Sequence, residues 1–121
     1  MQYYISKYNS DYNGKNVLLG GFKSTDIGTS GYKNVTLNSS ILEHKLIRFN
    51  CSYYIFGAPD YGGTNISVKR FVEKHNQEGI TVFSFDTASR FTIKYVNATT
   101  IAVIYTGTLS EHICMAVIAI L

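Results

Sequence analysis

The C-terminal stretch of the sequence, residues 79–121, reads GITVFSFDTASRFTIKYVNATTIAVIYTGTLSEHICMAVIAIL. Its apolar and polar rhythm predicts four successive strands, over 80–85, 91–96, 101–105 and 109–121. The three short connections carry turn residues, so we expect an antiparallel meander. From Ile113 onward both alternate sets of side chains are apolar, which requires cover on both faces of the last strand. A second sheet can supply one cover, and a loop layer or a neighbouring subunit the other.

Strands are also expected upstream, over residues 17–22, 32–37 and 46–56. The first contains Gly20 and Gly21, a pair that predicts a bulge or bend. In the third, every second side chain is apolar, whereas Arg48 and Asn50 belong to a wetter face. Ten Tyr and seven Phe, with many Thr, Val and Ile, favour strands over helices. We therefore predict an all-β protein, an antiparallel β-sandwich.

The chain of 121 residues is predicted to hold one domain with its own core. Residues 1–15 are polar and rich in Tyr, and we expect them to be a lead-in segment. Residues 16–121 are then the β-sandwich domain.

One segment, 66–77, is open to two interpretations. Val68, Phe71, Val72 and His75 have helical spacing, with Ser67 as a possible cap. A strand over 65–72 followed by a polar loop fits the pattern equally well.

Composition argues against several classes of partner. Charged residues make up 16% of the chain, and the net charge of +3 is scattered, so we expect no binding to nucleic acid. No apolar run has the length of a membrane span, and no secretory signal opens the sequence, so we expect no membrane insertion and synthesis in the cytosol. Cys51 and Cys114 lie in apolar contexts, which favours two buried thiols over a disulfide.

Candidate catalytic groups are few and separated. His44, His75 and His112 lie far from one another and from the cysteines, and an isolated His is more often a hydrogen-bonded residue than a ligand. The Asp residues stand in turn-like settings, where Asp favours the local backbone geometry. The sequence therefore predicts no catalytic activity, no metal site and no cofactor.

The candidate binding residues are aromatic and amide side chains in predicted loops. The segment 58–65, APDYGGTN, contains the only Pro of the chain and two adjacent Gly, which predict a loop. Tyr61 there offers a flat apolar face beside the hydrogen-bonding groups of Asp60 and Asn65, a combination that suits a sugar ring. A second polar loop would present His75 and Asn76. The alternative is a Tyr61 that folds back onto the edge of the sandwich.

Residues 31–57, GYKNVTLNSSILEHKLIRFNCSYYIFG, resemble the opening of a domain common at the C-termini of tailed-phage tail fibre proteins. In that family a small-residue loop leads to a short TLxxS strand and then to a long hydrophobic strand. Here VTLNSSI, 35–41, matches the first part and KLIRF, 45–49, the second; the final strand lacks the family's usual glycine. The resemblance spans about 17–121. It implies a β-sandwich head that trimerises and touches the host surface, and a strand rather than a helix over 66–72.

These observations predict a non-catalytic receptor-binding domain of a phage tail fibre, located in the virion and forming a homotrimer. Its partner would be a bacterial surface glycan or an outer-membrane protein. The alternative is a structural virion protein, a capsid decoration or tail-assembly component that binds only other virion proteins. A small glycan hydrolase is the third possibility.

Overall fold

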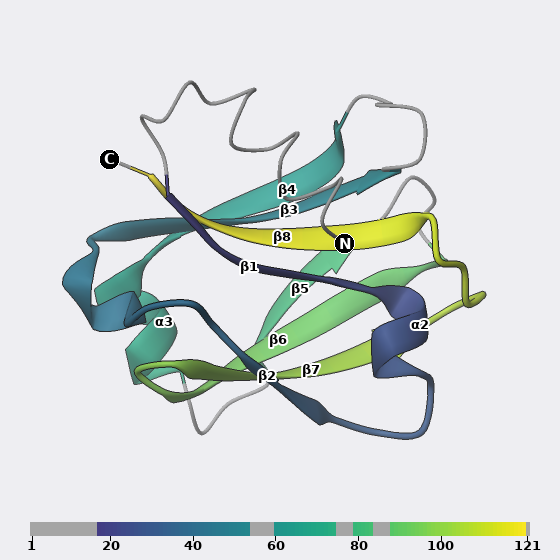
Figure 1. The fold of residues 1–121 in the computed structure, drawn as a ribbon, viewed down its shortest axis with the longest axis horizontal. Helices are drawn as coiled ribbons and strands as arrows, with labels where there is room; N and C mark the ends of the chain where they lie inside the picture. Colours follow the sequence, from purple (N-terminus) through teal and green to yellow (C-terminus); the bar gives the residue numbers. More distant parts are fainter. Residues whose placement is uncertain (1–16, 54–59, 75–78, 84–87, 121) are drawn as a thin grey trace.

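A computed structural model describes residues 17–53, 60–74, 79–83 and 88–120, with the backbone alone at 52–53 and 60–62. Two four-stranded antiparallel sheets pack against each other, with sheet A above sheet B in the view of Figure 1. This architecture confirms the predicted all-β sandwich. The predicted lead-in segment 1–15 lies outside the described residues.

Sheet A has the strand order β1-β8-β3-β4. In chain order its strands are β1 (Val17–Lys23), β3 (Leu46–Tyr53), β4 (Asp60–Ser67) and β8 (Ile113–Ile120). The register between β1 and β8 shifts between Leu18 and Gly20, which confirms the bulge predicted at the two glycines. β8, the last of the four in sequence, lies between β1 and β3 and pairs with both.

Sheet B has the strand order β2-β7-β6-β5. Its strands are β2 (Lys33–Thr36), β5 (Ile80–Phe83), β6 (Arg90–Asn97) and β7 (Thr100–Thr106). β5, β6 and β7 form the predicted meander.

The predicted fourth step of the meander is wrong, because the chain leaves sheet B after β7 and enters sheet A as β8. The predicted start of the last strand at Leu109 is also wrong. Residues 107–112 form the crossover, in which the N–H of Ile113 donates to the carbonyl of Ser110 over 3.1 Å. Ser110 also forms two hydrogen bonds with the buried Ser24. Ser24 Oγ donates to the carbonyl of Ser110 at 2.7 Å and accepts from the N–H of Ser110 at 2.9 Å. These hydrogen bonds occupy backbone groups that a strand would need for its ladder.

The core between the sheets contains several pairs of packed aromatic rings among aliphatic side chains. Phe91 packs against Tyr105, with ring centroids 4.8 Å apart, and Phe22 of sheet A meets Phe91 of sheet B at 5.6 Å. Phe49 and Phe71 pack at 5.3 Å. Each pair adds to the stability from burial because tilted and edge-to-face rings attract each other.

Both faces of β8 are buried in the single chain. Met115 and Val117, in the core, are 0% exposed, and on the opposite face Cys114, Ala116 and Ile118 are exposed by 1% or less. The predicted cover on both faces is therefore confirmed. Because one chain provides it, the apolar character of β8 does not require a neighbouring subunit.

Among the described residues, three short helical segments connect strands: α2 (Ser24–Ile27), the 3-10 turn η1 (Ile41–Glu43) and α3 (Val68–Glu73). β4 gives way to α3 at Ser67, whose Oγ accepts a hydrogen bond from the N–H of Arg70 at 3.1 Å. This cap and the burial of Val68 and Phe71 confirm the helical interpretation from residue 68 to 73, and the strand implied there by the resemblance is wrong. None of the described helices is long and apolar enough to cross a membrane.

Candidate ligand-binding site

The predicted binding loop 58–65 is largely a strand. Asp60, Tyr61 and Asn65 belong to β4, which pairs with β3 from Ser67 back to Asp60. The loop prediction is wrong for these residues because the turn-forming glycines are accommodated in the β3–β4 ladder, with a register shift between Cys51 and Ser52.

The other predicted site residues lie partly outside what the structure describes. His75 and Asn76 fall in 75–78, which is not described, and the side chains of Asp60 and Tyr61 are not described either. The structure therefore does not test whether these four side chains form a site.

Asn65 belongs to a polar cluster on the outer face of sheet A. Its Oδ1 accepts a hydrogen bond from Arg48 Nη1 at 3.0 Å, and Asn50 Oδ1 accepts one from Arg48 Nε at 2.8 Å. Pairing places Arg48 opposite Asn65 and Asn50 opposite Gly63, so four residues from two strands meet at one place. We call Arg48, Asn50, Gly63 and Asn65 the Arg48 cluster.

The cluster extends from the interior of the molecule to its surface. Asn50 is 0% exposed, so the face of β3 that the sequence predicts to be the wetter one is buried at this residue. Arg48 is half-buried, and Gly63 and Asn65 are exposed. A guanidinium anchored at its inner end by a buried amide has little freedom to reorient, so it is held in one geometry.

Gly63 provides the space that the guanidinium occupies. A Cβ at this position would lie 2.5 Å from Arg48 Cζ. This separation is too short for two carbon atoms that are not bonded, so one of them would have to move. Arg48 would then have to swing away from the surface of β4. The glycine in β4 thus sets the position of the guanidinium.

Arg48 has no counter-ion within the described part of the protein. Its interactions there are the two hydrogen bonds to Asn50 and Asn65, and both acceptors are neutral. Nη2 takes part in neither bond, and the Arg48 side chain is half-buried, not buried. Three of the five N–H donors of the guanidinium are left for an external acceptor.

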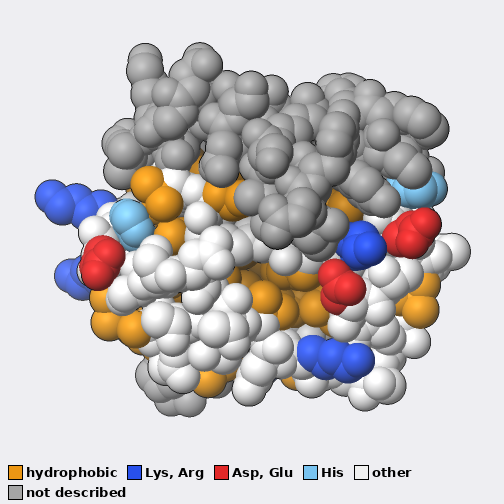
Figure 2. Space-filling view, viewed as in Figure 1, with side chains coloured by type: hydrophobic (Ala, Val, Ile, Leu, Met, Phe, Trp, Pro, Cys, Tyr) orange, Lys and Arg blue, Asp and Glu red, His pale blue; other side chains and the backbone are white. Residues whose placement is uncertain are grey.

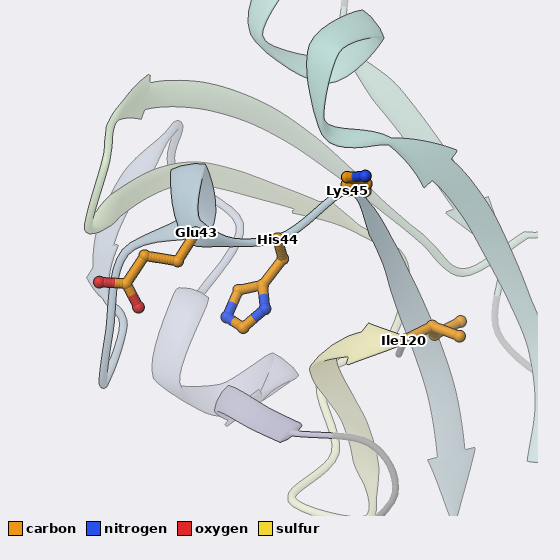
Figure 3. A pocket seen from close by; sticks show the side chains of 4 residues that line it. All are labelled: Glu43, His44, Lys45 and Ile120. Carbon is orange, nitrogen blue, oxygen red and sulfur yellow. The ribbon is translucent and has the colours of Figure 1, made fainter.

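A shallow pocket of about 230 Å³ lies elsewhere, beside η1 and the end of β8, and its described lining is Glu43, His44, Lys45 and Ile120 (Figure 3). His44 Nε2 is buried and makes no hydrogen bond to a described residue. In Figure 3 the Glu43 carboxylate points away from the imidazole. The two groups therefore do not form an acid–base pair.

The remaining candidate groups do not gather either. Within the described residues no three His, Cys, Asp or Glu side chains are placed to hold a metal ion. Cys51 faces the core, whereas Cys114, one pairing step away, belongs to the opposite face of sheet A. Both cysteines are buried, and no disulfide joins them, as predicted.

Charged groups on the face seen in Figure 2 are of mixed sign. Lys and Arg alternate with Asp and Glu at its two ends, and hydrophobic side chains lie between them. The described part of this face therefore carries no extended patch of one sign.

Sequence reasoning missed Arg48 as a site residue. A signal was present, since Arg48 and Asn50 alternate within a strand whose other face is apolar. The pairing of Arg48 and Asn50 with Asn65 and Gly63 could not be predicted from the sequence, because it depends on the register between two strands.

Comparison with known proteins adds no relative. No family model, no curated protein and no solved structure matches this chain.

Proposed function

We propose that this protein is a non-catalytic recognition domain, the receptor-binding part of a phage tail fibre, and that it binds its ligand on the β3–β4 side of sheet A. The observation that carries the proposal is the Arg48 cluster, a charged group fixed at a sheet surface with free donors and no counter-ion in the described protein. Functional groups on a rigid scaffold bind without a large ordering cost. The likeness of residues 31–57 to tail fibre domains supports the same assignment.

The partner in this proposal is a bacterial surface glycan or an outer-membrane protein, and the working form is a homotrimer in the virion. Both groups of ligands offer hydroxyl and carboxylate acceptors to a guanidinium. The trimer rests on the resemblance alone, because β8 is covered by its own chain.

A cell-binding experiment tests the function. The fluorescent-labelled domain is incubated with a panel of bacterial strains, and cell-associated fluorescence is measured with and without excess unlabelled domain. We expect saturable binding to a subset of strains. A second labelled β-sandwich of similar size and charge serves as the control for non-specific adhesion.

Failure to bind any strain, together with capture of other virion proteins, would favour the structural alternative. Release of reducing sugar from isolated surface glycans would instead identify an enzyme. Light scattering measures the trimer separately, and a monomer at micromolar concentration would contradict that part of the proposal.

A further inference from the structure

We infer that the Arg48 cluster is a carboxylate-binding site, so that the ligand of the recognition face is an acidic sugar. The assignment of the sugar rests on the proposed function. The assignment of the carboxylate rests on the cluster itself.

The first argument is charge. A half-buried guanidinium has lost part of its hydration, and a neutral amide replaces only part of that stabilisation. Both described partners of Arg48 are amide oxygens, so the positive charge is oriented without being neutralised. An anion at the surface would complete the site.

The second argument is geometry. Asn50 holds Nε, and Asn65 holds one N–H of Nη1. The free donors are on Nη1 and Nη2, the two terminal nitrogens that pair with both oxygens of a carboxylate. Gly63 and Asn65 are exposed beside them, so that neither presents a bulky side chain over the guanidinium.

The third argument selects a carboxylate over a phosphate. The described cluster holds one cation, and its other side chains are neutral amides. A single guanidinium matches the single charge of a carboxylate, whereas phosphate sites commonly gather several cationic or N–H donors. Asn65 could also donate through its amide nitrogen to a neighbouring sugar hydroxyl.

The competing explanation is that Arg48 only ties β3 to β4. In that case its replacement would change stability without changing any binding. Two variants separate the explanations. Arg48→Gln removes the charge, and Gly63→Ala keeps the charge but displaces the guanidinium, because the added Cβ meets the movable end of that side chain.

The experiment is a titration of the whole chain labelled with ¹⁵N, followed through the Arg Nε–H resonances. The probes are D-glucuronate, its neutral analogue D-glucuronamide and D-glucose 6-phosphate. We expect D-glucuronate to shift the Arg48 resonance, with at least about tenfold weaker binding for D-glucuronamide. Arg48→Gln and Gly63→Ala should each weaken D-glucuronate binding by about tenfold or more, judged from the backbone amides of β3 and β4. Arg70→Gln, at an exposed arginine of α3, should leave the affinity unchanged.

Equal shifts with D-glucuronate and D-glucuronamide would overturn the inference, as would undiminished binding by both variants or no shift at all. Stronger binding of D-glucose 6-phosphate would overturn the choice of carboxylate. The outcome is independent of cell binding. If the domain binds D-glucuronate through Arg48 but binds no bacterium, the carboxylate site stands and the proposed function is wrong. If the Arg48→Gln variant binds bacteria as well as the unchanged domain does, the proposed function stands and the carboxylate site is wrong.

Discussion

The outer faces of the two sheets differ, although both belong to antiparallel sheets that share one core. On sheet A, the outer side chains of β8 and the amide of Asn50 are almost completely buried. On sheet B, the outer face carries Thr81 and Thr92, whose Oγ atoms lie 3.4 Å apart, and Lys94, whose Nζ lies 4.7 Å from the ring centre of Tyr32. The outer face of sheet B is thus solvated, as in most antiparallel sheets. On the outer face of sheet A, by contrast, the apolar side chains of β8 are buried, and the buried amide of Asn50 accepts a hydrogen bond from Arg48.

The largest expected difference in stability is between an apolar side chain on the outer face of sheet A and one on the outer face of sheet B. Ile118→Ala on β8 should lower the free energy of unfolding by about 2–5 kcal/mol, since its side chain is 1% exposed. Ile104→Ala, on the outer face of β7 and half-buried, should cost about 1 kcal/mol. Urea denaturation measures both. Equal losses would mean that the two outer faces are alike and that the comparison is wrong.

A smaller difference is expected between two asparagines. Asn50→Ala leaves Arg48 Nε without its acceptor and empties a fully buried position, which should cost about 1–3 kcal/mol. Asn34→Ala, exposed on β2, should stay within about 0.5 kcal/mol. Thermal melts followed by circular dichroism suffice, and an Asn50→Ala protein as stable as Asn34→Ala would show that the buried amide contributes little.

Two glycines provide the finest comparison. Gly79, before β5, has a φ of +90°, and a Cβ there would lie 2.7 Å from the carbonyl oxygen of Ile93. Gly79→Ala should therefore lose about 1 kcal/mol or more, because the backbone cannot yield. Gly63→Ala meets the flexible side chain of Arg48 rather than backbone, so it should cost no more than the hydrogen bonds of Arg48 to Asn50 and Asn65 that it disrupts, about 0.5–1 kcal/mol. A larger loss for Gly63→Ala, measured in the same urea series, would mean that Arg48 cannot move aside.

The elements that the sequence predicted well have strong local patterns. β8 was recognisable because both of its faces are apolar, and the bulge in β1 because two glycines adjoin. The cap of α3 was one of two interpretations, and the hydroxyl of Ser67 decides between them in the structure.

The errors arise where pairing overrides local preference. β4 contains Gly62 and Gly63 and follows a proline, so its residues predicted a loop, yet β3 supplies the partner for its backbone. The crossover of the chain from β7 in sheet B to β8 in sheet A could not be predicted, because a connection this short is equally compatible with a hairpin. The Arg48 cluster joins residues 17 positions apart, and only the register of the ladder brings them together.

The position of β8 between β1 and β3 has a consequence for how quickly the protein folds. Val17 pairs with Ala119, so nearly the whole chain must be gathered before these strands meet, and such distant pairings slow the search for the native state. β5, β6 and β7 are neighbours in sequence and can pair early, whereas β1 and β3 present unpaired edges until β8 inserts. During synthesis those edges are open to other chains. The order of the strands thus makes sheet A the late and aggregation-prone half of the molecule, and a chaperone that shields β1 and β3 would raise the yield of folded protein.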